Sequence, residues 1–311
     1  MIVTLTMNPA LDITTEIDAV VPTHKMRCGP PRYDPGGGGI NVARVARVLG
    51  ARVSAIFPEG GVTGESLCRR LAESGVPTDR VPIREPTRES FTVNEIGSGR
   101  QYRFILPGPH VSDAEQTECL DRLRHVAPAA QFVVASGSLP PGVPADFYQR
   151  VADVCSGLAV PLILDSSGIG LQHLRGEVFL LKPSVRELGD YFGRETATED
   201  EQIAAARTLI DTGRSRNVVV SRGGEGALLV TSHGAQRFSP ITVPPGSGVG
   251  AGDAMVAGIA VGLTRGWALD RAVLLGTAAG AAMLLTPGTA ACAQADVERL
   301  LGQATEPVVV S

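Results

Sequence analysis

Short runs of apolar, often β-branched residues recur along the chain, and amphipathic segments separate them. The runs predict buried strands, and the segments whose apolar residues repeat every three or four positions predict helices. Continuous apolar strands that alternate with helices are typical of a parallel sheet covered on both faces. We therefore predict strands at 2–6, 53–57, 132–135, 161–164, 178–181 and 218–221, and helices at 40–49, 64–74, 114–125, 145–155 and 201–211.

Two regions break this alternation. Residues 13–19 and 27–33 have strand character with no helix between them, and so do residues 90–96 and 101–105. Gly97–Gly99 supplies the turn between the second pair. These four pieces predict a small separate sheet.

The last third of the chain predicts two packed helices. Residues 254–263 are apolar on all sides, which is typical of a buried helix, and residues 269–285 form a second apolar segment rich in small residues. Small side chains allow close helix packing. A functional site is expected beside these two helices, because a glycine-rich stretch comes just before the first helix.

Composition excludes several classes of protein. The 311 residues carry a net charge of −4, which gives no basic field for nucleic acid. The five cysteines are scattered without a CxxC pair, which favours reduced thiols in a cytoplasmic protein. The five histidines show no metal-ligand spacing. The first residues lack the features of a signal peptide, and the most apolar stretch, 276–285, is too short for a membrane span.

The sharpest chemical signal is Gly250-Ala251-Gly252-Asp253, directly before the first apolar helix. Glycines let backbone N–H groups converge, and a helix N-terminus adds free donors and a positive dipole end, so together they predict an anion hole. Asp253 would stay ionised there and accept a hydroxyl proton during phosphoryl transfer. The alternative is a simple helix N-cap.

A second signal is the glycine run Gly36–Gly39, followed by Asn41. Four consecutive glycines are entropically costly to order, which makes sense where a ligand touches the backbone. The Asn41 amide can donate and accept hydrogen bonds, as a sugar hydroxyl requires. The alternative is a flexible loop before a helix.

These two segments, GGGGINVAR at 36–44 and GAGD at 250–253, resemble the two signatures of the PfkB, or ribokinase-like, carbohydrate kinases. Their order and spacing also match. The resemblance implies a ribokinase-like three-layer α/β/α Rossmann-like core with a small β-sheet lid. It further implies a single kinase domain over residues 1–311, with lid strands drawn from about 13–33 and 88–106.

The resemblance also implies a sugar-phosphate side of the site. Asp12, Gly37, Gly38 and Asn41 would bind sugar hydroxyls, with Ser138 of the segment SGSLPPG touching the substrate. Two arginines on the lid strands, Arg88 and Arg103, would hold the substrate phosphate through their planar donor forks, with Lys25 as a third cation.

On the nucleotide side, the segments around Lys182 and Ser221 resemble ATP-binding segments of the family. The residues implied are Lys182, Ser184, Glu187, Ser221, Gly223 and Gly226. Glu187 matches the acidic end of the family's Asn-x-x-Glu motif, which organises Mg²⁺ and the phosphates, but Ser184 stands at the Asn position. A monovalent cation such as K⁺ would sit near Val249 and 287–290.

Within the family, several segments, including DSSG at 165–168, are most similar to the minor bacterial 6-phosphofructokinase branch. The resemblance implies ATP-dependent phosphorylation of fructose 6-phosphate at its 1-hydroxyl. The 1-phosphofructokinase and tagatose-6-phosphate kinase branches share most of these segments and stay open. A kinase for an unphosphorylated sugar would leave Arg88 and Arg103 unused, and a sugar-phosphate sensor without turnover is the non-enzyme alternative. A homodimer paired through the lids is expected.

Overall fold

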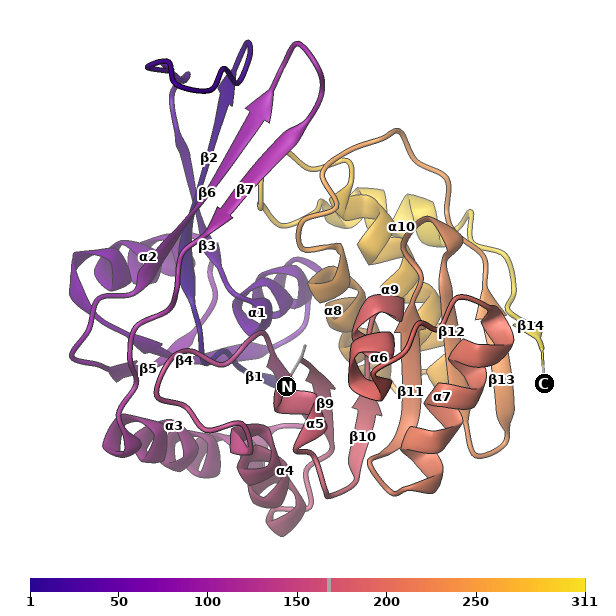
Figure 1. The fold of residues 1–311 in the computed structure, drawn as a ribbon. Coiled ribbons are helices and arrows are strands. Elements are labelled where there is room, and N and C mark those ends of the chain that lie inside the picture. Colours follow the sequence, from indigo (N-terminus) through magenta and orange to yellow (C-terminus); the bar gives the residue numbers. More distant parts are fainter. Residues whose placement is uncertain (167–168, 311) are drawn as a thin grey trace.

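The computed structural model describes residues 1–166 and 169–310, and ten of its strands form one mixed sheet (Figure 1). Seven neighbouring strands pair in parallel, and three antiparallel strands extend one edge. In spatial order the strands are β14 (Val308–Val309), β13 (Gly234–Phe238), β12 (Ala227–Thr231), β11 (Ser215–Ser221), β10 (Val178–Leu181), β9 (Leu162–Asp165), β8 (Phe132–Ser136), β1 (Ile2–Leu5), β4 (Val53–Glu59) and β5 (Thr78–Pro82).

Helices cover both faces of this sheet, so the core has three layers. One buried apolar cluster lies between the sheet and α1 (Gly38–Val48), α2 (Gly61–Glu73), α8 (Ala251–Thr264), α9 (Leu269–Met283) and α10 (Gln294–Leu301). A second cluster packs α3 (Asp113–Val126), α4 (Phe147–Gly157), α5 (Ile169–Gln172), α6 (Val185–Phe192) and α7 (Glu199–Asp211) against the other face. Two 3₁₀ turns complete the core, η1 (Ala127–Ala129) and η2 (Gly223–Glu225).

A four-stranded sheet projects from the core and forms the lid (Figure 1). Its order is β3 (Arg32–Gly36), β2 (Ala10–Ile17), β6 (Arg88–Glu95) and β7 (Gln101–Ile105). The central pair β2–β6 is parallel and the outer pairs are antiparallel.

The predicted three-layer core and the separate lid sheet are therefore confirmed. One lid strand was wrong: residues 27–33 were predicted, but β3 covers Arg32–Gly36. Pro30 and Pro31 explain the error, because proline cannot donate to a sheet ladder. The lid also extends beyond the expected segments, from Ala10 in β2 to Gly36 in β3.

The order of the strands fixes where a site can form. From β1 the chain builds outward through β4 and β5 on one side and through β8 to β11 on the other. Ligands in open α/β sheets bind at the carboxyl ends of strands beside such a switch point, here between β1 and β8. The lid begins at this same edge, because β2 follows β1 directly. Every helix in the described ranges falls short of the length and apolarity needed to span a bilayer.

Candidate active site

Polar side chains from four elements meet at the carboxyl edge of the sheet. Ser136 ends β8, Asp165 ends β9 and Lys182 follows β10, while Asp253 lies in the first turn of α8. Adjacent strands place the first two side by side, since Ser136 and Asp165 are partners in the β8–β9 ladder. The sheet and the N-terminus of α8 thus assemble a compact polar centre from distant segments.

Asp253 is held by two side-chain donors. The amide Nδ2 of Asn41 donates to Asp253 Oδ2 at 2.9 Å, and the hydroxyl of Ser136 donates to Asp253 Oδ1 at 3.2 Å. The two predicted motifs, 212 residues apart in sequence, are therefore in direct contact through Asn41 and Asp253. The reading of Asp253 as a simple N-cap is wrong, because the α8 cap is Gly250 and Asp253 lies within the helix.

The expectation that the helix dipole keeps Asp253 ionised needs correction. Burial raises the pKa of Asp253 to about 7, and the nearby Asp165 carboxylate also raises it. The hydrogen bond from Asn41, the Lys182 ammonium and the hydrogen bond from Ser136 lower the pKa but do not outweigh burial. A carboxylate with a pKa near the working pH is well suited to general-base catalysis.

The start of α8 provides an open cradle beside Asp253. Gly250 adopts a left-handed conformation with φ of 78°, which lets the chain turn sharply into the helix. Gly252 faces Lys182, and a Cβ on Gly252 would lie 3.6 Å from Lys182 Nζ, an ordinary contact distance. Protein packing therefore does not force a glycine at 252. The backbone N–H groups of Gly250 and Gly252 next to an ammonium suit an anionic group, whereas the Ala251 N–H already donates to the Gly248 carbonyl at 3.2 Å.

Packing within the protein accounts for the glycine run Gly36–Gly39. A Cβ on Gly36 would collide with the Asp12 carboxylate, and a Cβ on Gly38 would collide with Ser136. A Cβ on Gly39 would come within 2.7 Å of the Leu5 carbonyl oxygen, and Gly37 has φ of +111°. Close packing of α1 and β3 against site residues and β1 requires these glycines, so contact with a ligand is not needed to explain them.

The residues predicted for the sugar side lie on the lid face that carries Asp12. Strand register places Asp12, Arg88 and Arg103 on one face, because Ser90 pairs with Asp12 and Thr92 pairs with Arg103. Burial raises the pKa of Asp12 to about 6, although Arg88, Arg103 and Arg44 act to lower it. Asp12 itself lies within strand β2.

The two lid arginines differ in how they are held. Arg88 donates to the backbone oxygens of Leu106 at 3.1 Å and Asn8 at 3.2 Å, which anchors it at the base of the lid. Arg103 is exposed on β7. Ser138 is also exposed, and its hydroxyl accepts a hydrogen bond from Asn8 Nδ2 at 3.1 Å.

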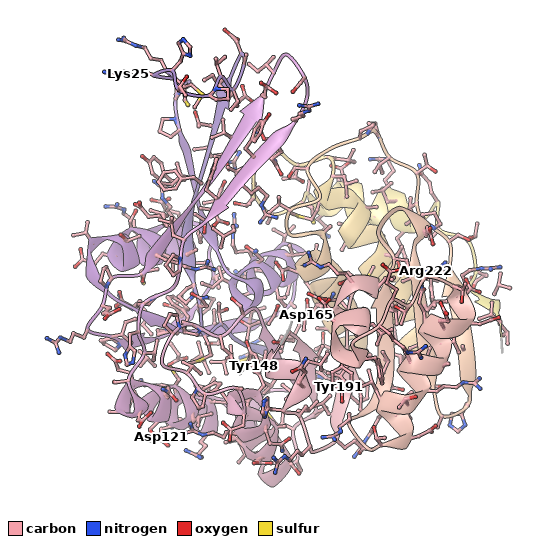
Figure 2. The ribbon with its side chains drawn as sticks, viewed as in Figure 1. Lys25, Asp121, Tyr148, Asp165, Tyr191 and Arg222 are labelled. Atoms are coloured by element: carbon pink, nitrogen blue, oxygen red, sulfur yellow. The ribbon has the colours of Figure 1, made fainter. Side chains whose placement is uncertain are left out.

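Lys25 is not brought to this group within one chain. It lies in the exposed segment between β2 and β3, at the tip of the lid and far from Asp165 (Figure 2). The structure thus unites Asp12, Arg88 and Arg103 and leaves Lys25 apart.

A buried ion pair forms the floor between the two halves of the site. Lys182 Nζ lies 3.2 Å from Asp165 Oδ1, and the Lys182 side chain is only 4% exposed. Burial acts to lower the pKa of Lys182, but Asp165, Glu187 and Asp253 together raise it, so the lysine is a cation. A fixed buried cation beside Gly252 suits the charge of transferring phosphates.

Glu187 and Ser184 form a reciprocal capping box at the start of α6. Glu187 Oε2 accepts hydrogen bonds from the Ser184 backbone N and hydroxyl, each at 2.8 Å, and the Glu187 backbone N donates to the Ser184 hydroxyl at 3.2 Å. Serine at the position of the family Asn therefore fixes the Glu187 side chain. The described residues contain no group of three or more His, Cys, Asp or Glu that could hold a metal ion by themselves.

A cavity of about 550 Å³ opens next to the start of α8. It reaches from the loop after β11 to α9, and Ala251 and Gly252 form one of its walls. Ile241, Val243, Met255 and Leu284 supply apolar lining, as a planar base requires. The predicted nucleotide residues Ser221, Gly223 and Gly226 all line this cavity.

The two loop glycines play different parts. Gly223 has φ of +57° and open space where a Cβ would stand, whereas a Cβ on Gly226 would collide with the Phe238 carbonyl. The approach of β13 thus requires a glycine at 226, and the predicted contact of Gly226 with a nucleotide stays a prediction.

Comparisons with known proteins show the family of this chain. The model of the pfkB family of carbohydrate kinases matches residues 5–296. The chain belongs to the pfkB family. It is 63% identical over 309 residues to the ATP-dependent 6-phosphofructokinase isozyme 2 of Mycobacterium tuberculosis, covering 99% of this chain and 91% of that protein.

Two solved structures match nearly the whole chain. Phosphofructokinase-2 from Escherichia coli in complex with potassium superimposes with a TM-score of 0.93 at 38% identity, covering 97% of this chain and 98% of that one. The same enzyme in complex with fructose 6-phosphate gives a TM-score of 0.91 at 36% identity, with the same coverage.

Some residues of the candidate site were not predicted from the sequence. Ser136 and Asp165 were quoted within motifs but given no role, although both are carboxyl-end residues of parallel strands, a position that marks ligand sites. Of the motif at 165–168, Ser167 and Gly168 lie outside the described residues. Arg44, the last residue of the first pfkB signature, was likewise given no role.

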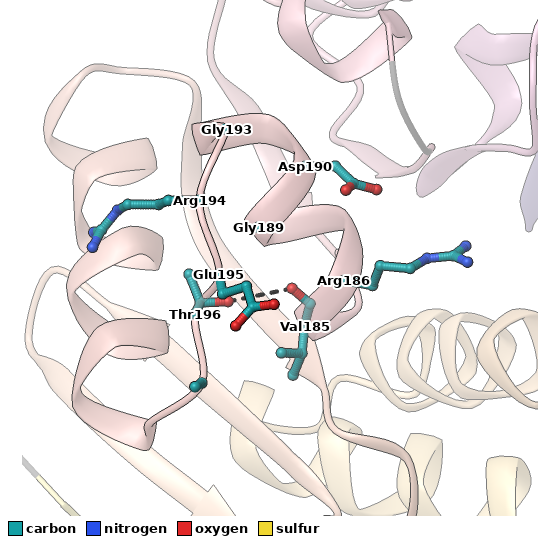
Figure 3. A pocket seen from close by; sticks show the side chains of 9 residues that line it. Val185, Arg186, Gly189, Asp190, Gly193, Arg194, Glu195 and Thr196 are labelled. Carbon is teal, nitrogen blue, oxygen red and sulfur yellow. Dashed lines mark hydrogen bonds between the residues drawn. The ribbon is translucent and has the colours of Figure 1, made fainter.

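A separate hollow of about 700 Å³ lies beside α6 (Figure 3). Thr196 donates to the Val185 carbonyl at 3.3 Å across its floor, and the charged side chains of Arg186 and Arg194 point in opposite directions. Polar groups do not converge there as they do around Asp253.

Proposed function

We propose that this chain transfers the γ-phosphoryl group of ATP to the 1-hydroxyl of fructose 6-phosphate, giving fructose 1,6-bisphosphate and ADP. The observation that carries the proposal is the place of Asp253. It lies between a lid face bearing Asp12 and two arginines and a cavity lined by the nucleotide-loop residues, directly beside the α8 cradle. The lid and the core act together as one kinase domain.

In this mechanism, the oxygen of the sugar hydroxyl attacks the γ-phosphorus, and Asp253 accepts the proton of that hydroxyl. The bond from that phosphorus to the β,γ-bridging oxygen breaks, and ADP leaves with the electron pair. Asn41 and Ser136 orient the Asp253 carboxylate by donating to its two oxygens. Backbone N–H groups of the α8 cradle and the Lys182 ammonium stabilise the charge on the transferring group.

The lid residues Asp12 and Arg103 would bind the sugar phosphate. A carboxylate can accept hydrogen bonds from two sugar hydroxyls, and Arg88 and Arg103 on the same lid face would pair with the phosphate already on the sugar. Ser138, Gly37, Gly38 and Asn41 complete the sugar pocket in this proposal.

Magnesium fits the residues present. Carboxylate oxygens are the ligands that Mg²⁺ prefers, and Glu187 keeps one oxygen outside its capping box. Asp165 and Glu187, both coupled electrostatically to Lys182, would hold the ion through water and the ATP phosphates. An ion held there would neutralise charge on the phosphates.

A monovalent cation fits only in part. Backbone carbonyls at Val249 and in 287–290 were expected to bind it, but the Thr289 carbonyl already accepts a hydrogen bond from Arg44 at 2.7 Å. The remaining carbonyls would have to supply the ligands. The five cysteines are free thiols, which fits a cytoplasmic enzyme.

We also propose a homodimer that pairs through the lids. Tyr33, Ile13, Phe91 and Phe104 stand in one row across the four lid strands, on the face opposite Asp12. Phe91 and Phe104 are 36% and 55% exposed, and an apolar row of this kind on an open sheet needs cover. Such pairing is also the arrangement that could bring Lys25 to a site, that of a second copy.

The test is a substrate panel in a coupled ADP-release assay. Fructose 6-phosphate, fructose 1-phosphate, tagatose 6-phosphate and free fructose are compared with ATP, with and without Mg²⁺, and in K⁺ or Na⁺ buffer. The highest kcat/KM for fructose 6-phosphate, only with Mg²⁺, is expected. A higher value for fructose 1-phosphate or tagatose 6-phosphate would establish the alternative branches, and binding without turnover would establish a sensor.

A further inference from the structure

A small cavity of about 10 Å³ lies where helix α1 meets the start of α8 and the loop that follows α9. Asn41 and Arg44 of α1 line it, together with Gly250 and Thr289. Asn41 and Arg44 are three residues apart on one helix, so their side chains lie on the same face. The cavity therefore adjoins the residue that holds Asp253.

Three polar atoms of these residues have no hydrogen-bond partner among the described residues. They are Asn41 Oδ1, Arg44 Nε and Thr289 Oγ1. Arg44 and Thr289 are only 7% and 6% exposed. A buried polar atom left unpaired is costly, and such atoms normally bond to protein or to ordered water. All three belong to residues that line one small cavity, which favours a shared partner.

We propose that one ordered water molecule binds in this cavity and bridges Asn41, Arg44 and Thr289. The water accepts a hydrogen bond from Arg44 Nε–H, donates one to Asn41 Oδ1, and makes the third with the Thr289 hydroxyl. Buried waters typically make about three such bonds, and a cavity of roughly 10–15 Å³ is the least that holds one. The volume of about 10 Å³ is at the size that holds one water molecule.

The chemistry of the lining excludes a metal cation as the occupant. Arg44 is a guanidinium that already donates to the carbonyls of Pro35 at 2.9 Å and Thr289 at 2.7 Å, and it lies 3.6 Å from Asp34. Its remaining Nε–H is a donor, which cannot ligate a metal ion. A second positive charge beside it would also be repelled.

The water acts on the active site through Asn41, an inference that rests on the proposed role of Asp253. The Asn41 amide is planar, so fixing Oδ1 also fixes Nδ2, which donates to Asp253 Oδ2 at 2.9 Å. Thr289 and Arg44 thereby become positioning residues. They hold the Asn41 donor against the base without touching it themselves.

Thr289 offers a clean test. Its hydroxyl has no protein partner in the described ranges, so Thr289→Val removes the bond to the water at nearly constant shape. Thr289→Ser keeps the hydroxyl and serves as the matched control. Arg44 is less suitable, because it also ties Asp34 and Pro35 of the lid base to the core.

The first measurement is a high-resolution crystal structure of the full chain, with thallium soaked in as a probe for cations. One water within hydrogen-bond distance of all three atoms, with no thallium signal, is expected in the wild type and in Thr289→Ser. Missing density, or a thallium peak in the cavity, would overturn the site, whether or not Thr289→Val folds.

The second measurement is the pH profile of kcat with saturating substrates. Losing one net hydrogen bond should lower kcat of Thr289→Val about 3- to 10-fold. The acid limb of its pH profile should move to higher pH, because a loosened Asn41 no longer favours the ionised form of Asp253. The two charged groups that face Asp253 are Asp165 and Lys182, and the substitution leaves both unchanged. Thr289→Ser should keep kcat and the acid limb near those of the wild type.

An unchanged kcat and acid limb in Thr289→Val would overturn the positioning role. Failure of the proposed function looks different. In that case Asp253→Asn keeps its activity, while the bridging water is still seen in the crystal.

Discussion

At the scale of single residues, Asp253 decides whether the site is catalytic. We expect Asp253→Asn to lower kcat by ~10²–10⁴, the usual contribution of a general base, while fructose 6-phosphate still binds. The change keeps the shape of the side chain and removes only its ability to take a proton. Steady-state kinetics give kcat, and calorimetric titration gives sugar-phosphate affinity.

The matched control for that experiment is Asp121→Asn. Asp121 is an exposed residue of α3, on a part of the molecule remote from Asp165 (Figure 2). It should keep full activity. A near-wild-type kcat in Asp253→Asn would remove Asp253 from the mechanism.

The raised pKa of Asp253 gives a pH prediction. A base with a pKa of about 7 is protonated below that pH, so kcat should fall as the pH drops through 7. Well below the pKa, the loss should approach about tenfold per pH unit, since only the ionised fraction is active.

Ser136→Ala tests the assignment of that limb. Removing the Ser136 hydroxyl takes away a hydrogen bond that lowers the pKa of Asp253, so the limb should move to higher pH. A limb that stays in place would mean that a different group, such as the substrate phosphate, titrates in this range.

Sequence predicted the identity of the central residues but not their environment. Asp253 and Asn41 could be found because each follows glycines at a helix start. Their contact could not, since it depends on how α1 and α8 pack, and burial then reversed the expected effect of the helix dipole on Asp253. Gly36 and Gly38 show the same limit, because their need for small size comes from Asp12 and Ser136, which only the fold brings near.

At the scale of secondary-structure elements, the lid strands β6 and β7 should set substrate specificity. Arg103→Ala should raise KM for fructose 6-phosphate roughly 30-fold, about 2 kcal/mol, and leave KM for ATP almost unchanged. This is the low end for a lost charge partner, because Arg103 is exposed and its charge is screened by solvent. The preference over free fructose should fall in parallel.

Arg84→Ala is the control for the loss of a positive charge. Arg84 is exposed between β5 and β6, outside the lid sheet. If Arg103→Ala weakens ATP binding and keeps the preference for phosphorylated sugar, the arginines are not the phosphate clamp.

The loop after β11 carries a second prediction at this scale. Arg222 donates to Glu199 of α7 at 2.7 Å and to Glu225 of the loop at 2.8 Å, and its side chain is 11% exposed. This pairing fixes the loop of Ser221–Gly226, which lines the cavity proposed to bind ATP. Arg222→Met should raise KM for ATP roughly fivefold, about 1 kcal/mol, with little effect on the sugar.

Arg237→Met is its matched control, because Arg237 also contacts Glu199, at 3.3 Å, but lies on β13 and is 44% exposed. It should leave both KM values near the wild type. Equal effects of the two changes would show that Glu199, rather than the position of the loop, is what matters.

Element types were predictable where the pattern was strong and local. The parallel strands β1, β4 and β8 to β11 are continuous apolar runs, and all were found. The antiparallel edge strands β12 and β13 were missed as separate elements, because β12 continues directly from the glycine-rich loop and β13 is short and mixed in polarity. The position of strand β3 was predicted too early in the chain. Its true position depends on its pairing with β2, which extends through Pro35.

At the scale of the whole molecule, the lid sheet leaves part of an apolar face exposed to solvent. The lid has one polar face, turned to the site, and one face on which Tyr33, Ile13, Phe91 and Phe104 stand in register. Only part of this second face is covered, with Arg70 of α2 stacked 5.2 Å above the Tyr33 ring. The uncovered part is the outer pair of strands, β6 and β7.

A second copy of the chain is the partner that would cover this surface symmetrically, and Phe91→Glu tests it. A carboxylate placed in an apolar interface loses its hydration without gaining a partner, so the dimer of two 32.4 kDa chains should dissociate to monomers. Sedimentation velocity measures the mass directly. Val62→Glu, at an 81% exposed position on α2 outside the lid, is the matched control and should stay dimeric. A monomeric wild type, or a dimeric Phe91→Glu, would show that the lids do not pair through this face.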